Sequence, residues 1–243
     1  MIILYLVVAF VATALALNAL NRRKTDDLRQ TGLYPPPGRG TDADVERLVA
    51  LDRRHTGKLL RPGRSERILD AGCGTGTHLG LMLRSGSSPV GLDLSRGMLN
   101  VTRGKYPSVP LAQADLNDQL PVRRRAFDAV LCALVGEHLS NLRLLFREIG
   151  DSLARGGRFV FSVFHPEMAA AGIEANFERD GVEYRLGALR HTVADYLNLI
   201  DRAGFRRIEV HEFRGDDVLV QQVPWASKYL GRPLLLAVEA RKS

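Results

Sequence analysis

Residues 68–76 read ILDAGCGTG, a short apolar run that ends in three glycines at alternate positions. The apolar part is typical of a buried strand, and the next segment, 77–86, has the pattern of a helix. Glycine permits positive φ angles and lets another group approach the backbone closely. The stretch therefore fits either a tight packing loop or a loop that contacts a ligand. Other features of the sequence distinguish these two interpretations.

Apolar runs and helical patterns alternate after residue 66, which predicts an α/β domain with a mainly parallel sheet covered on both faces. In such sheets the ligand lies beyond the carboxyl ends of the strands. The strands are expected at 67–72, 89–95, 109–116, 127–135, 158–164, 206–213 and 234–242. The helices are expected at 77–86, 95–106, 141–157 and 192–205, after a first helix from Thr41-Asp42 to about Leu60.

An acidic residue near the glycine loop favours the ligand-binding interpretation. Asp93 ends the second apolar run, 17 residues after Gly76, where a carboxylate can accept hydrogen bonds from both hydroxyls of a ribose. The alternative role for Asp93 is to cap the helix that follows. No GK[ST] follows the loop and its spacing is not G-x-G-x-x-G, so triphosphate and dinucleotide sites are disfavoured. Asp70, before the loop, is placed to meet an ammonium group.

Four ordered segments resemble the motifs of class I S-adenosylmethionine-dependent methyltransferases, in particular the small-molecule group that includes quinone-biosynthesis enzymes. They are ILDAGCGTG, VGLDLSRGML, AQADLNDQLP and FDAVLCALVGEHL, and the likeness extends over about 66–243. The resemblance implies a Rossmann-like, seven-stranded, mostly parallel sheet and S-adenosylmethionine as cofactor. It also implies that Asp93 holds the ribose, that Met98 and Leu116 pack near the adenine, and that Asp115 takes the adenine amino group. The residues expected to bind the cofactor are Asp70, Gly72, Cys73, Gly74, Thr75, Gly76, Asp93, Leu94, Met98, Asp115 and Leu116.

Two histidines follow the fourth and fifth strands, at the edge of the sheet where the acceptor pocket is expected. His138 is predicted to act as a base or an orienting group, and His165 to shape the acceptor site, because a histidine can accept a proton at cellular pH. Each has an alternative role, in which it caps a strand end or only hydrogen-bonds the acceptor. His191 is expected to cap a helix or line the pocket wall. The 165–190 insertion mixes apolar and polar residues, which suits a small acceptor with an apolar body.

The first 20 residues carry no charged side chain and are long enough to cross a bilayer as a helix. The triplet Arg22-Arg23-Lys24 follows at once, which favours a cytoplasmic location for the rest of the chain. We therefore expect a membrane anchor at 1–21, a linker at 22–41 that contains Pro35-Pro36-Pro37, and a methyltransferase domain at 42–243. A cleaved signal peptide and a buried core helix are the alternatives to the anchor.

Composition limits the possible partners. The net charge is +7, but the basic clusters are short, so a solvated or membrane-facing surface is favoured over a nucleic-acid partner. The two cysteines lie in apolar stretches without metal-ligand spacing, and no metal is expected. The function expected is methyl transfer to a small molecule, with a lipophilic acceptor among the candidates. A non-catalytic, cofactor-binding assembly factor and a nucleic-acid or protein methyltransferase remain alternatives.

Overall fold

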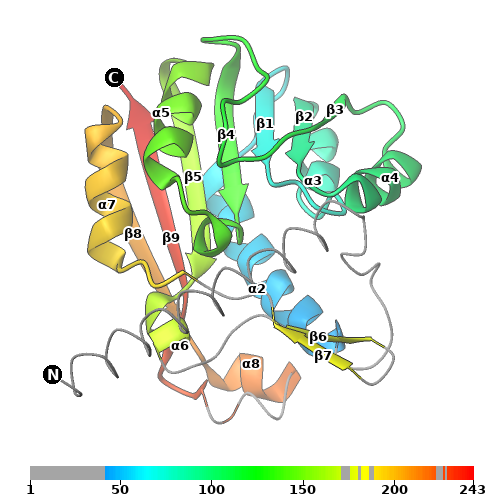
Figure 1. Ribbon diagram of the computed structural model, residues 1–243, viewed down its shortest axis with the longest axis vertical. Helices are drawn as coiled ribbons and strands as arrows, with labels where there is room; N and C mark the ends of the chain where they lie inside the picture. Colours follow the sequence, from blue (N-terminus) through cyan, green and yellow to red (C-terminus); the bar gives the residue numbers. More distant parts are fainter. Residues whose placement is uncertain (1–41, 171–175, 180–181, 186–188, 223–226, 228) are drawn as a thin grey trace, which may run out of the picture.

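The computed structural model describes residues 42–170, 176–179, 182–185, 189–222, 227 and 229–243 (Figure 1). The anchor and linker expected at 1–41 lie outside these residues. Within the described part of the chain, no helix combines the length and the hydrophobicity needed to cross a bilayer.

A seven-stranded sheet forms the centre of the domain, in the order β3-β2-β1-β4-β5-β9-β8. All neighbouring strands pair in parallel except at β9, which runs antiparallel to both β5 and β8. The strands are β1 Arg67–Ala71, β2 Ser88–Asp93, β3 Leu111–Gln113, β4 Phe127–Ala133, β5 Leu153–Phe164, β8 Phe205–Arg214 and β9 Pro233–Lys242. The expected mostly parallel, Rossmann-like sheet is therefore confirmed.

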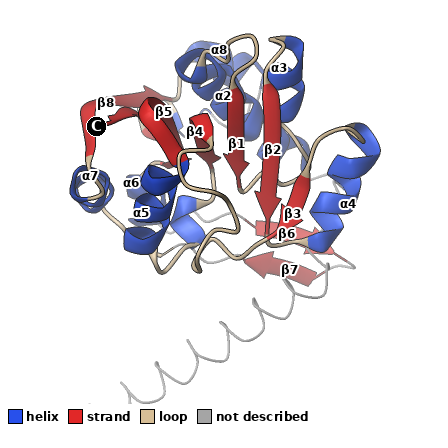
Figure 2. Ribbon diagram, turned by 90° about the horizontal axis from the view of Figure 1, so that it is seen from above, coloured by secondary structure: helices blue, strands red, loops and turns tan. Residues whose placement is uncertain are grey.

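Helices cover both faces of this sheet (Figure 2). The main helices are α2 Asp42–Leu60, α3 Leu79–Arg84, α4 Arg96–Lys105, α5 Leu142–Ser152 and α7 Val193–Arg202. Neighbouring strand residues point to opposite faces. Leu69 accordingly belongs to the core cluster that contains residues of α5 and α7, whereas Ile68 belongs to the cluster that contains residues of α2 and α3.

Short elements complete the chain at the carboxyl edge of the sheet. They are the 3-10 helix η1 Gly136–His138, helices α6 Pro166–Ala170 and α8 Asp217–Gln222, and the hairpin strands β6 Asn176–Arg179 and β7 Val182–Arg185. The 165–190 insertion, expected to lie beyond the fifth strand, therefore contributes α6 and this hairpin.

The helix expected at 141–157 is shorter than predicted. Residue Leu153 adopts an extended conformation and pairs with Phe127, so α5 ends at Ser152 and β5 begins five residues before the expected strand. The register then shifts, and Arg158 is the partner of Ala129. The prediction was wrong here because strand pairing, which is not visible in local sequence, overrode the helical pattern.

Candidate functional site

A cavity of about 290 Å³ lies at the carboxyl ends of β1, β2, β3 and β4, near the small end of the usual range for ligand pockets. Most of the residues predicted to bind the cofactor line it, and so does His138. The predicted residues in its wall are Gly72, Cys73, Gly74, Thr75, Asp93, Leu94, Met98, Asp115 and Leu116. Asp52, Thr77, His78, Asn117 and Val135 line it as well, although sequence reasoning did not select them.

The glycine loop has the geometry that requires glycine. Gly72, Gly74 and Gly76 have φ angles of 87°, 52° and 81°, in the left-handed region that other residues rarely adopt. A Cβ atom on Gly72 would lie 3.1 Å from Val135 Cγ1, and one on Gly76 would lie 3.0 Å from the Tyr106 ring. The loop therefore packs tightly at Gly72 and Gly76, whereas a Cβ on Gly74 would meet only Met98 Sδ, at 3.6 Å. Gly72 and Gly74 both line the cavity.

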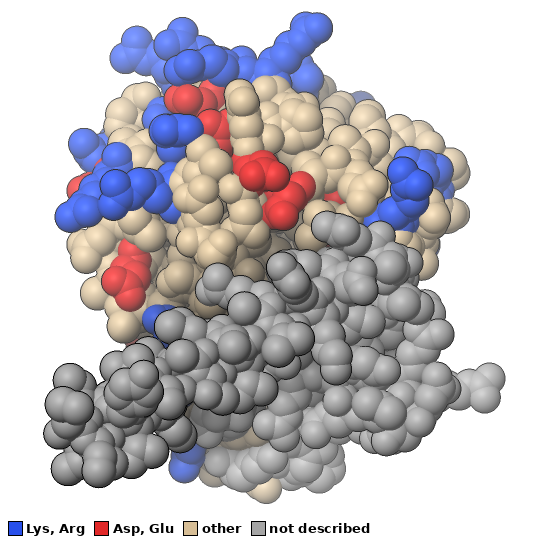
Figure 3. Space-filling model, in the orientation of Figure 1, with Lys and Arg blue, Asp and Glu red and all other residues tan. Residues whose placement is uncertain are grey.

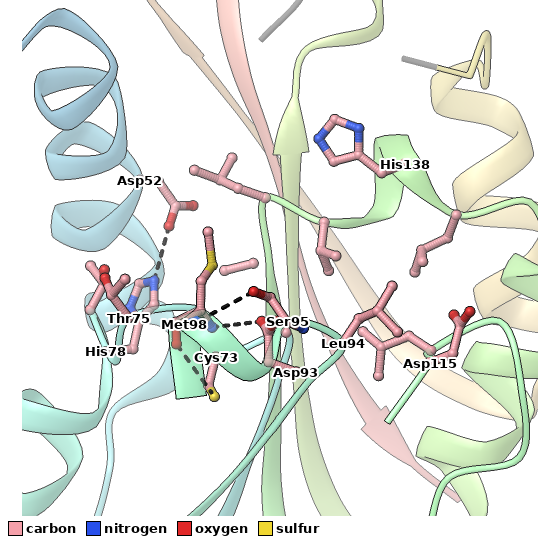
Figure 4. Close-up of a pocket in the computed structure, with 18 of the residues that line it drawn as sticks. Asp52, Cys73, Thr75, His78, Asp93, Leu94, Ser95, Met98, Asp115 and His138 are labelled. Atoms are coloured by element: carbon pink, nitrogen blue, oxygen red, sulfur yellow. Dashed lines mark hydrogen bonds and ion pairs between the residues drawn. The ribbon is translucent and has the colours of Figure 1, made fainter. Parts of the chain in front are cut away.

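Asp93 organises this loop from the end of β2. Its Oδ2 accepts a hydrogen bond from the Gly74 N–H at 2.8 Å, and its Oδ1 accepts one from the Ser95 N–H at 2.8 Å (Figure 4). Burial raises the pKa of Asp93, and these two hydrogen bonds partly oppose the rise. The cap of α4 is Ser95, whose side chain accepts from the Met98 N–H, so Asp93 does not have the capping role considered above.

Asp115 marks the other end of the cavity. Its Oδ1 accepts hydrogen bonds from the backbone and side-chain N–H groups of Asn117, at 2.8 and 3.1 Å. The Asn117 side-chain oxygen in turn accepts from the Ser140 and Asn141 N–H groups. These contacts fix the segment after β3 against the segment after η1, which brings Asp115 and His138 to the same cavity.

Asp70 and Gly76, which were also predicted to bind the cofactor, are not among the lining residues. The Asp70 carboxyl is 1% exposed, and neither of its oxygens has a hydrogen-bond partner among the described residues. Burial raises the pKa of Asp70 to about 6, and the nearby His78 partly opposes this. Asp70 therefore lies behind the glycine loop rather than in the cavity wall.

The three candidate histidines have different surroundings. His138 is the last residue of η1. This helix packs closely against β5, as shown by Gly136, where an added Cβ would lie only 2.5 Å from Phe161 Cζ. His165 is outside the cavity, 2% exposed, with Nε2 3.4 Å from Glu212 Oε1. His191 contacts the Leu139 carbonyl at 3.0 Å but does not cap α7, because Thr192 and Asp195 form that cap.

Asp52 and His78 form a buried pair at one end of the cavity. Sequence reasoning did not select either residue. His78 Nε2 is 3.2 Å from Asp52 Oδ2, and both side chains are buried. His78 lies two residues after the glycine motif, so its position in the sequence could have suggested that it lines the cavity. Asp52 is 26 residues earlier on α2, and only the packing of this helix brings it to the cavity.

Comparison with known proteins gives a family for this site. Residues 69–161 match the family described as "Methyltransferase domain". A demethylmenaquinone methyltransferase from Tropheryma whipplei is 31% identical over 49% of this chain and 51% of its own length, so the match spans about half of that relative. A ubiquinone biosynthesis O-methyltransferase from Ralstonia nicotianae is 29% identical, with coverages of 63% and 67%. A crystal structure of an S-adenosylmethionine-dependent methyltransferase from Mesorhizobium loti superimposes with a TM-score of 0.65 at 29% identity, covering 77% of this chain and 96% of that one.

Proposed function

The chain contains a class I S-adenosylmethionine-dependent methyltransferase domain, and from this premise we propose that it methylates a small, lipophilic acceptor at the cytoplasmic face of a membrane. The observation that carries the proposal is that most of the residues predicted to bind the cofactor line one cavity together with His138. Two relatives, the demethylmenaquinone methyltransferase and the ubiquinone biosynthesis O-methyltransferase, support a lipophilic acceptor.

The residues present in the cavity fit S-adenosylmethionine. The backbone at Gly74 leaves room at the cavity wall that a side chain would fill. Asp93 provides a carboxylate with oxygen lone pairs left over after its two backbone contacts. Leu94, Met98 and Leu116 provide an apolar surface for the adenine ring. These contacts would orient the cofactor with its ribose at Asp93 and its adenine near Asp115.

When bound, S-adenosylmethionine supplies an electrophilic methyl group on a sulfonium. The chain has to hold the acceptor in line with that group, and correct positioning alone contributes most of the rate enhancement. His138 would accept the proton that an acceptor hydroxyl or carbon acid loses, which adds typically 10²–10⁴-fold. Val135 and Leu139 line the cavity close in sequence to His138 and would contact the apolar body of the acceptor.

The proposed location rests on the anchor expected at 1–21 and on the position of α2. This helix begins at Asp42, immediately after the expected linker, and its Asp52 lines the cavity. A chain anchored through this helix would hold the cavity close to the bilayer, where a lipophilic acceptor is concentrated. Full-length protein is then expected to remain with membranes after a high-salt wash, since burial of about 20 apolar residues is not electrostatic. Recovery in the salt-washed soluble fraction would remove the anchor from the proposal.

The acceptor is tested with the full chain and methyl-labelled S-adenosylmethionine. Lipid extract and aqueous extract from the same cells are offered as separate acceptor pools, with Gly74→Val protein as the control that is expected to bind the cofactor least. We expect the label to enter the lipid extract with the unmodified chain only. Label that enters only aqueous metabolites, nucleic acid or protein would contradict a lipophilic small-molecule acceptor, and no label in any pool would favour a non-catalytic cofactor-binding protein.

A further inference from the structure

The buried His78 imidazole lies at the end of the cavity opposite the residues proposed to contact the adenine. One of its two nitrogens has no hydrogen-bond partner among the described residues. Figure 4 shows Asp52, His78 and Thr75 on one side of Asp93, and Leu94 and Asp115 on the other. With the ribose at Asp93 and the adenine near Asp115, the methionine part of the cofactor extends toward His78. We propose that His78, held in place by Asp52, binds the carboxylate of that methionine part.

The first argument is the fixed orientation of the ring. Asp52 Oδ2 is 3.2 Å from His78 Nε2, and Asp52 Oδ1 accepts a hydrogen bond of 2.5 Å from the Ser162 hydroxyl. The Thr56 hydroxyl donates to the Asp52 carbonyl at 2.7 Å. Asp52 is therefore held by β5 and by its own helix. The ring that it binds has little freedom to turn, because 8% of the His78 side chain is exposed.

The second argument is the unused nitrogen. His78 Nδ1 is buried and has no hydrogen-bond partner among the described residues, although His78 lines the cavity. Buried polar atoms in native proteins nearly always have a partner, so an exception calls for a ligand or an ordered water. Since Nε2 is turned toward Asp52, Nδ1 is the atom left for a ligand.

The third argument is charge. Burial by itself lowers the pKa of His78. The hydrogen bond to Asp52 and the charge of the nearby Asp70 together raise this pKa by more than burial lowers it, so the net shift is upward. Arg53 on α2 acts in the opposite direction. An upward shift favours the imidazolium, which carries a proton on both nitrogens. Nδ1–H is then a charged donor for a carboxylate, and such bonds are stronger than neutral ones.

The experiment compares two ligands that differ only in this group. S-adenosylmethionine and decarboxylated S-adenosylmethionine are titrated calorimetrically into the full chain. The unmodified protein is expected to bind S-adenosylmethionine about 10 to 100 times more tightly. In His78→Gln this preference should fall below about threefold, through loss of affinity for S-adenosylmethionine alone. His165→Gln, the same exchange at a buried histidine outside the cavity, is the matched control and should keep the preference.

A pH series with the unmodified protein tests the same contact without a variant. Because the bound carboxylate stabilises the imidazolium, binding of S-adenosylmethionine takes up protons, and its advantage over the decarboxylated ligand falls as the pH rises from about 6 to 8. A preference that is independent of pH, or one that survives in His78→Gln, would overturn the proposal. This inference rests on the cofactor part of the proposed function and not on the acceptor. If no methylated product is found, the acceptor proposal fails, but the measured affinities still decide whether His78 binds the carboxylate.

Discussion

The half of the sheet formed by β3, β2, β1 and β4 and the half formed by β5, β9 and β8 contribute differently to the site. In the first half, a cavity-lining residue follows each strand within two residues; these are Gly72, Leu94, Asp115 and Leu134. In the second half, β5 runs into His165, which is buried against Glu212 outside the cavity. The first half therefore forms the wall of the cavity proposed to bind the cofactor, while β5 leads to a buried histidine outside that cavity.

This difference predicts that substitutions in the first half change binding and chemistry, and that those in the second half change mainly stability. The two halves are joined by the parallel pairing of β4 with β5, and they also contact each other at η1. The Leu189 N–H donates to the Glu137 carbonyl at 2.8 Å, and His191 contacts the Leu139 carbonyl. The segment before α7 is therefore the structural link between α7 and His138.

The largest expected effect is that of Gly74→Val. Gly74 has a φ of 52°, and its N–H and C=O groups are bonded to Asp93 and Thr102. A branched side chain strains that backbone and fills space at the cavity wall, so cofactor affinity should fall more than about 100-fold. Calorimetry with S-adenosylmethionine measures the loss. Gly104→Ala, on α4 with open space around its position, is the control and should keep the affinity of the unmodified protein. Retained binding in Gly74→Val would separate the loop from the cofactor site.

Asp93→Ala should have the next largest effect. It removes the carboxylate proposed to bind the ribose, and charge-assisted hydrogen bonds contribute about 1.5–3 kcal/mol, so affinity should fall roughly 10- to 100-fold. The substitution also frees the Gly74 and Ser95 N–H groups. Asp93→Asn, which keeps one acceptor oxygen, should therefore lose less affinity than Asp93→Ala. Unchanged affinity in both variants would refute the assignment.

The variants His138→Ala and His165→Gln compare how the two halves of the sheet contribute to turnover. With the true acceptor, turnover should fall at least about tenfold while cofactor affinity stays nearly the same, because His138 is proposed to act on the acceptor. His165→Gln should leave turnover close to that of the unmodified protein and lower thermal stability, since it disturbs the contact of a buried histidine with the partly exposed Glu212. Equal turnover in His138→Ala would remove its catalytic role. A large loss of turnover in His165→Gln would instead return His165 to the acceptor site, as the sequence suggested.

The sequence predicted the first half better than the second for a physical reason. Strand and glycine loop are neighbours along the chain from 68 to 76, and Asp93 ends the next strand, so the local pattern of two consecutive strands contains the geometry of Gly72, Gly74 and Asp93. Asp52 reaches His78 only because α2 packs across the sheet, and α5 ends at Ser152 only because Leu153 pairs with Phe127. Such contacts join residues that are distant in sequence, and no local pattern encodes them.

The smallest expected effect is that of Thr192→Ala at the start of α7. The Thr192 hydroxyl accepts from the Asp195 N–H at 3.1 Å, and the Asp195 carboxylate accepts from the Thr192 N–H at 2.8 Å. Loss of such a cap costs about 1 kcal/mol, which corresponds to roughly 2–4 °C in the thermal midpoint of a domain of this size. Thr192→Ser keeps the hydroxyl and should retain the midpoint of the unmodified protein. Cofactor affinity should be unchanged in both variants, because α7 packs on the second half of the sheet and none of its residues lines the cavity. Parallel losses of stability and cofactor affinity in Thr192→Ala would show that the second half also determines the donor site, through the contacts of Leu189 and His191 with the segment around His138.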